Sequence, residues 1–92
     1  MKAENILKEY VSRLEEACGE EKDYIVILRL EKRNEALKKI LSKGETIRSF
    51  SQILTKIRFK GKILNVFKTG KLVVKDVKSK EELEVLLSEL LA

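Results

Sequence analysis

The stretch FSQILTKIRFKGKILNVFKTGKLVVKDVKS, residues 50–79, decides the fold of this chain. Apolar side chains alternate with polar ones along it, and Gly61 and the turn at residues 68–70 interrupt the alternation. Side chains of a strand point alternately to the two faces of a sheet, so alternation between turn residues is typical of strands. The stretch therefore predicts three consecutive antiparallel strands.

The alternation gives these strands two faces of different composition. One face is nearly all apolar and comprises Ile53, Ile57, Phe59, Leu64, Val66, Leu72 and Val74. The other mixes aromatic rings, amides and cations and comprises Phe50, Gln52, Leu54, Lys56, Arg58, Asn65, Phe67, Val73 and Lys75. An apolar sheet face must pack against another layer, so we expect helices to cover the first face. We expect the second, called the open face from here on, to carry the function.

The N-terminal part predicts one helix and one more strand. Residues 3–18 have apolar side chains at three- and four-residue spacing and are followed by Gly19, which predicts a helix. The apolar run Tyr24–Leu30 predicts a strand. Its Ile25, Ile27 and Arg29 would share the open face. Alternatively, the strand is buried on both sides, with Arg29 near its end.

Two further helices complete the predicted architecture. Asn34–Lys43 predicts the second helix, and residues 45–49 would connect it to the three strands. Ser79 and Glu82 have the spacing of a capping box, which begins a leucine-rich last helix. The order α-β-α-β-β-β-α predicts a single α+β domain over residues 1–92. Its curved antiparallel sheet would have about four strands and helices on one face.

Composition limits the classes of function. The 92-residue chain has no apolar run of membrane-spanning length and no signal-peptide pattern, so we expect a cytoplasmic protein. The single Cys18 fits a reducing compartment and, as part of an apolar stripe, a buried structural thiol. Without histidine we expect no metal site, and no motif implies a cofactor. Abundant Lys, Glu, Ile and Leu, with no Pro, Trp or His, is typical of heat-adapted organisms.

Positive charge is concentrated in one segment. Residues 48–80 hold ten Lys and Arg against the single acid Asp76, a net charge of +9, whereas the whole chain carries +5. This concentration favours binding to a polyanion. The segment offers no histidine, no glycine-rich phosphate loop and no carboxylate pair on the open face, so we do not expect an enzyme.

The segment FKTGKLVVKDVKS, residues 67–79, resembles the signature Phe-Ser-Ser-Gly-Lys-Met-Val-Cys-Thr-Gly-Ala-Lys-Ser of the TATA-box-binding protein family. Six positions are identical: Phe67, Gly70, Lys71, Val73, Lys78 and Ser79. Continuing upstream without a gap, Phe50 falls on the other phenylalanine of the family's intercalating pair. Lys56 and Arg58 fall on a basic strand end that follows the phosphate backbone. The resemblance covers residues 24–91, one of the family's two repeats, and leaves the N-terminal helix outside.

This chain also departs from the family pattern. It has one repeat in place of two, and Asp76 replaces a glycine. Asn65 and Lys75 stand where the family prefers an apolar residue and a threonine against the minor groove. These differences bear on TATA recognition rather than on the fold.

The resemblance implies a non-catalytic nucleic-acid-binding protein with a role in transcription. Phe50 and Phe67 would be wedges between base steps. Base edges or sugars would be contacted by Gln52, Asn65 and Val73, and phosphates by Lys56, Arg58, Lys75, Arg29 and Lys71. DNA is favoured over RNA, and the same rings could instead stack on unpaired bases.

Several alternatives remain open from the sequence. Two copies could pair their Tyr24–Leu30 strands about a twofold axis to form a homodimeric saddle, or a monomer could cover that edge with its N-terminal helix. The phenylalanines could pack on each other or in a dimer interface, with the lysines as solvated edge charges. The domain could also be a protein–protein interaction module for an acidic partner, or hold an apolar ligand between helix and sheet.

Overall fold

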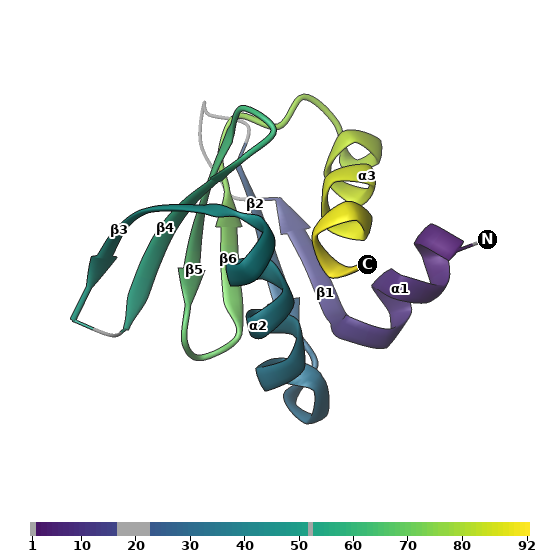
Figure 1. Cartoon of the computed structure of the whole chain (residues 1–92). Helices are drawn as coiled ribbons and strands as arrows, with labels where there is room; N and C mark the ends of the chain where they lie inside the picture. The colour runs from purple at the N-terminus through teal and green to yellow at the C-terminus, as the bar shows by residue number, and fades with distance from the viewer. Residues whose placement is uncertain (1, 17–22, 52) are drawn as a thin grey trace.

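The computed structural model describes residues 2–16, 23–51 and 53–92, without the side chains of residues 2–4. Cys18, Gly19 and Gln52 lie outside the described residues. The elements are α1 (Lys2–Tyr10), β1 (Val11–Glu16), β2 (Tyr24–Leu28), the short 3-10 helix η1 (Leu30–Lys32), α2 (Arg33–Lys43), β3 (Glu45–Phe50), β4 (Leu54–Phe59), β5 (Lys62–Phe67), β6 (Lys71–Val74) and α3 (Lys80–Leu91) (Figure 1).

The described strands form one antiparallel sheet in the order β1-β2-β6-β5-β4-β3. The predicted α+β class is therefore confirmed, but the predicted count of about four strands is wrong, because the sheet has six. Its edge strands are β1 and β3. None of the helices in the described part of the chain is long and apolar enough to cross a membrane.

The core lies between the helices and one face of the sheet. Side chains from β2, β4, β5 and β6 meet those of α2 and α3 there; those with no exposed surface are Val26, Ala36, Ile40, Ile57, Leu64, Leu72, Val74, Leu83, Leu87 and Leu90. Burying each large apolar side chain contributes roughly 1.5–3 kcal/mol. The covered face predicted from the alternation is confirmed, with one exception. Ile53 lies in the β3–β4 turn and is 62% exposed.

The start of α3 and the end of α2 lie where the sequence predicts them. The Ser79 hydroxyl accepts a hydrogen bond of 3.2 Å from the backbone N–H of Glu82, which confirms the capped start of α3. Helix α2 ends at Lys43 as predicted, and the backbone N–H of Gly44 bonds the Ile40 carbonyl at 2.9 Å. These two helices therefore follow from short-range chemistry.

The prediction of a helix over residues 3–18 is wrong in its second half. Helix α1 ends at Tyr10, and Val11–Glu16 form β1, which pairs antiparallel with β2. The apolar residues Val11 and Leu14 suit a helical stripe in the sequence. In the fold, however, pairing with β2 satisfies the backbone of both strands, and this tertiary gain overrides helix propensity.

Strand β2 is shorter and more central than predicted. It ends at Leu28, and Leu30 begins η1 with 79% of its surface exposed. Arg29 is not on the open face, because its Nε donates a 2.7 Å hydrogen bond to the Lys8 carbonyl of α1. β2 pairs with β1 on one side and β6 on the other. The expectation of an edge strand at Tyr24–Leu30 is therefore wrong, and a dimer seam there is blocked by β1.

Residues 45–49 are not a connection but most of β3. Phe50 is the last residue of this strand rather than the first of the next, and Ser51 and Ile53 lie in the turn to β4. The turn is closed by a 3.0 Å hydrogen bond from the Ile53 N–H to the Phe50 carbonyl, with Ser51 at a φ of 49°. All six β3 residues are exposed, so no burial alternation marks the strand in the sequence.

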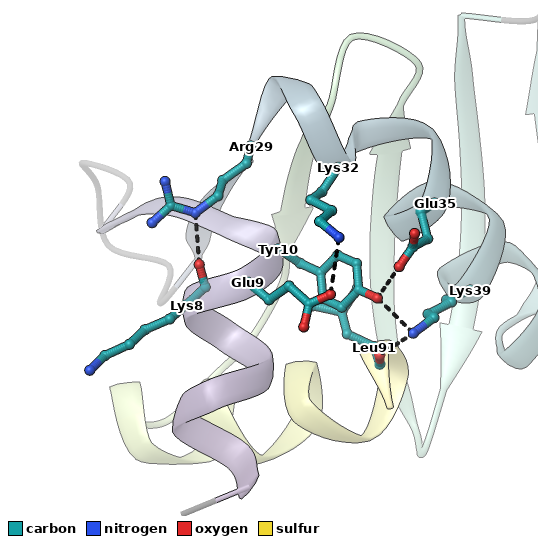
Figure 2. Close-up of polar contacts among 8 residues, drawn as sticks. All are labelled: Lys8, Glu9, Tyr10, Arg29, Lys32, Glu35, Lys39 and Leu91. Carbon is teal, nitrogen blue, oxygen red and sulfur yellow. Dashed lines mark hydrogen bonds and ion pairs between the residues drawn. The ribbon is translucent and has the colours of Figure 1, made fainter.

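A polar cluster fastens α1 to the two other helices (Figure 2). The buried Tyr10 donates its hydroxyl hydrogen to the Glu35 carboxylate of α2 and accepts a 2.7 Å hydrogen bond from Lys39 Nζ. Lys39 also donates to the Leu91 carbonyl of α3 at 3.3 Å and lies 4.8 Å from the centre of the Tyr10 ring. The cluster therefore ties α1, α2 and the end of α3 together.

The cluster predicts a component of stability that is lost in acid. The hydrogen bond from Tyr10 lowers the pKa of the Glu35 carboxyl, and this carboxyl therefore stabilises the fold above its ordinary pKa. The contribution disappears as the pH falls through the lowered pKa. The free energy of unfolding, measured with urea, should fall on acidification from neutral pH to below the ordinary carboxyl range. We expect this fall to be smaller in Glu35→Gln than in the unaltered protein. Glu31→Gln, which removes an exposed charge outside the cluster, should retain the full acid loss.

Gly44 predicts a second, steric test of the fold. A Cβ at this position would lie 2.5 Å from Cδ1 of the buried Ile57, although the backbone there (φ −80°) suits any residue. We expect Gly44→Ala to lower the free energy of unfolding by about 1–3 kcal/mol through overpacking. Ile57→Val removes Cδ1 and therefore the clash. The double variant should lose less free energy of unfolding than the sum of the losses in the two single variants. Additive losses in urea unfolding would contradict the proposed contact.

Candidate nucleic-acid interface

The strand register assembles the open face in rows. Directly opposite residues of antiparallel strands lie on the same face, so each row crosses the sheet from β3 to β2. One row is Phe50, Leu54, Phe67, Lys71 and Ile27. The next is Arg48, Lys56, Asn65, Val73 and Ile25. A shorter third row is Glu45, Arg58 and Ile63.

The two phenylalanines lie in the same row with Leu54 between them. Phe50 is 37% exposed and Phe67 is half-buried. They are two strands apart, so their backbones are separated by roughly 10 Å. Each ring has a cation beside it: the Arg48 guanidinium is 5.0 Å from the centre of the Phe50 ring, and Lys71 Nζ is 5.6 Å from that of Phe67. Each aromatic ring of the open face is therefore paired with a neighbouring cation.

Five cations of the basic segment lie on the open face: Arg48, Lys56, Arg58, Lys71 and Lys75. Two of them have carboxylate partners, Arg58 with Glu45 at 2.8 Å and Lys75 with Asp23 at 3.6 Å. The Arg58–Glu45 pair is exposed on both sides, and in the Lys75–Asp23 pair only the lysine is. Exposed ion pairs contribute little to stability and are screened by salt. These cations can therefore exchange a carboxylate for a phosphate at small cost.

Other cations of the same segment turn toward α3. Lys60 pairs with Glu89, and Lys62 pairs with Glu82 at 2.9 Å. The hydrogen bond from Lys62 lowers the pKa of the Glu82 carboxyl. The net charge of +9 is therefore less concentrated on the open face than the sequence indicates.

The centre of the open face is apolar apart from one amide. Half-buried side chains surround it on β2, β5 and β6: Ile25, Ile27, Ile63, Val73 and Phe67. Asn65 lies among them, opposite Val73 on β6 and Lys56 on β4. Its Oδ1 is buried and has no hydrogen-bond partner among the described residues. An unpaired acceptor at the middle of the face is a place where a donor from a ligand would be favourable.

The structure brings most of the predicted site residues together. Those on the open face are Phe50, Phe67, Asn65, Val73, Lys56, Arg58, Lys71 and Lys75. Arg29 is separate, and Gln52 lies outside the described residues. Their role in binding stays a prediction. Sequence reasoning missed Ile63 and Arg48, although each stands two residues before an open-face residue and the period of two could have found them.

Hollows also lie outside the open face among the described residues. One, of about 350 Å³, lies between α2 and the end of β4 and β5 and is lined by Leu37, Leu41, Ile53, Thr55, Val66 and Lys68. The volume is at the lower end for ligand sites. Between α3 and the centre of the sheet the space is filled by fully buried leucines. A second hollow, of about 370 Å³, lies between α3 and the β4–β5 hairpin and is lined by Lys60, Lys62, Glu82, Val85, Leu86 and Glu89. Within residues 2–16, 23–51 and 53–92, no three His, Cys, Asp or Glu side chains are grouped so that they could hold a metal ion.

Comparisons of the chain with protein-family models, with curated proteins and with solved structures give no match. The resemblance to the TATA-box-binding protein family therefore rests on the residues quoted above.

Asn65 tests whether the open face carries a residue that lowers the stability of the fold, as expected of a residue kept for binding. Replacing an unsatisfied buried amide with an apolar, β-branched side chain should stabilise the sheet, so we expect Asn65→Val to raise the free energy of unfolding by about 1 kcal/mol. Urea unfolding measures the change. Asn65→Ala, which removes the amide without filling the space, is the matched control. A loss of stability in Asn65→Val would show that the amide is satisfied in solution.

Proposed function

We propose that this chain is a cytoplasmic, non-catalytic protein that binds nucleic acid, with DNA favoured over RNA, through the open face of its sheet. The observation that carries the proposal is the placement of two phenylalanine rings and five cations on the face that the described helices leave uncovered. A polyanion with flat apolar bases matches that combination, because phosphates pair with the cations and bases contact the rings.

Each part of the face has a role in this proposal. Phe50 and Phe67 contact bases, either as wedges in a duplex or as stacking platforms for unpaired bases. The cations beside the rings, Arg48 and Lys71, are close enough to reach the phosphates of the same nucleotides. Asn65 offers its unpaired Oδ1 to a donor on a base edge. Val73 packs beside it against sugars or bases.

The element order supports a likeness to one repeat of the TATA-box-binding protein family. From β2 onward the chain runs strand, helix, four antiparallel strands and a C-terminal helix. Residues 24–91, which carry the resemblance, make up this part. The added strand β1 lies outside it and pairs with β2.

A protein partner with an acidic surface is the second candidate. The half-buried Ile25, Ile27, Ile63 and Val73 form an apolar centre with cations around it. Protein interfaces have this arrangement, an apolar core with a polar rim. Binding to such a partner would need no nucleic acid and would depend on the isoleucines more than on the two rings.

The proposal is tested by fluorescence anisotropy of labelled A·T-rich duplex, G·C-rich duplex and single-stranded DNA, and of RNA, over a salt series. We expect binding that weakens steeply with salt. Phe50→Ala or Phe67→Ala should weaken it about 5- to 150-fold, because contact of a base with an aromatic ring is worth roughly 1–3 kcal/mol. Lys56→Ala should reduce the slope of log K against log salt by about 0.7–0.9, the loss of one phosphate contact.

Lys60→Ala is the matched control for net charge. It removes one cation from the same basic segment, but from the side that faces Glu89 of α3. It should leave the salt slope nearly unchanged. Equal effects of Lys56→Ala and Lys60→Ala, or binding that ignores both rings in folded variants, would reject the open face as the site. No binding of any probe at low salt would favour the protein partner.

A further inference from the structure

The structure assigns a second interaction surface to the edge strand β3. We infer that two copies of this chain pair their β3 strands antiparallel about a twofold axis, which joins their sheets and open faces into one. In this dimer Glu45 of each copy meets Arg48 of the other. The inference does not depend on nucleic-acid binding.

Strand β3 has the features of an unfinished edge. It is the last strand of the sheet, so one side of its backbone has no strand partner in the described part of the chain. All six of its residues are exposed, on both faces. Unpaired edge strands are ready templates for another strand, and proteins guard them with charged side chains, above all lysine, with proline, with short length or with a bulge. β3 contains neither lysine nor proline and is as long as β4 and β5, with six residues each, but it carries Glu45, Arg48 and a bulge.

Apolar side chains are also concentrated at this edge. Of the six large apolar side chains exposed among the described residues, two lie on β3, one in the turn after it and one on α2: Ile47 at 44%, Phe50 at 37%, Ile53 at 62% and Leu41 at 39%. Leu41 and Ile53 line the hollow between α2 and β4. The helices that cover the rest of the sheet do not shield β3, so a second copy would remove apolar surface from water here.

A bulge in β3 decides how two copies can pair. Between Thr46 and Arg48 the register with β4 shifts by one residue, with Ile47 as the extra residue. As a result Glu45 and Arg48, three apart, both lie opposite open-face residues, Arg58 and Lys56. An antiparallel pair that sets Glu45 against Arg48 of the partner copy keeps both on the open face and places Thr46 opposite Ile47 at the axis.

Charge selects the same register. The pairing brings two Glu45–Arg48 contacts of opposite charge across the seam, and opposite charges directly across two strands are favourable. Shifting by one residue would set Thr46, which is on the covered face, against Arg48 on the open face. Shifting further would bring the two Arg48 side chains together. Within one copy Arg48 lies opposite Lys56, a like charge, and it takes part in none of the ion pairs found among the described residues, although it lies over the Phe50 ring. Glu45 pairs with Arg58 in the same copy at 2.8 Å, so in the dimer its carboxylate would lie between Arg58 of its own copy and Arg48 of the partner copy.

The edge strand β1 lacks the exposed large apolar side chains found at β3. Its Leu14 is packed against the core, and Arg13 and Glu15 lie within 4.0 Å of each other in the same copy. None of the exposed large apolar side chains lies on it. The β1 edge therefore serves as the control surface.

A charge-exchange experiment tests the inference. Sedimentation velocity over a wide range of protein concentration should show the unaltered chain passing from monomer to dimer. Glu45→Arg alone sets arginines against arginines at both contacts, and Arg48→Glu alone sets glutamates against glutamates, so each should weaken the dimer at least about tenfold. An equimolar mixture of the two variants restores both opposite-charge contacts. Native mass spectrometry should therefore show the heterodimer in excess over either homodimer.

The controls make each outcome decisive. Circular dichroism must show that both variants fold, and Arg13→Glu on β1 should dimerise like the unaltered chain. The inference is overturned by a chain that stays monomeric at every concentration, because the bulge would then be guarding the edge. It is also overturned if the single variants dimerise normally, if their mixture forms no heterodimer, or if Arg13→Glu abolishes the dimer.

Discussion

One-sided burial of the sheet is the constraint on which the rest of this structure depends. The fully buried side chains of α3 and α2 press on alternate residues of β2, β4, β5 and β6. Because side chains of a strand alternate, fixing one set inward forces the intervening set outward. A slip of one residue in β4, β5 or β6 would bury lysine, arginine or asparagine and expose part of the core. The open face is thus held in place by the packing on the opposite side of the sheet.

The hairpins then decide which outward residues become neighbours. The short connections after β3, β4 and β5 join β3 to β6 in sequence order, so consecutive strands lie side by side. This register places Phe50 and Phe67 in one row, although seventeen positions separate them in the chain. The same geometry divides the basic segment. Cations at the outward positions of the strands reach the open face, whereas Lys60 in the β4–β5 turn and Lys62 at the start of β5 pair with glutamates of α3.

The two edge strands of the sheet, β1 and β3, differ in what packs around them. At one end, β1 covers β2, and α1 is fastened to the other helices through the Tyr10 cluster (Figure 2). At the other end, β3 carries no cover on either face. Both ends of the sheet have an edge strand, but only β3 is exposed at every residue, so association through β3 alone would close a dimer instead of growing a chain of copies.

The sequence by itself determined the elements that have short-range signals. Period-two alternation gave β5, β6 and most of β4, the serine cap and leucine spacing gave α3, and the glycine after Lys43 gave the end of α2. The apolar and mixed faces also followed from alternation, and with them eight of the ten candidate site residues. Only the tertiary structure decided β1 and β3. Val11–Glu16 has an apolar spacing that suits a helix, and β3 is exposed throughout, so each strand exists because a neighbour supplies its hydrogen bonds. The place of Arg29, the central position of β2 and the division of the lysines between two sides likewise depend on contacts between residues far apart in the chain, which no local pattern records.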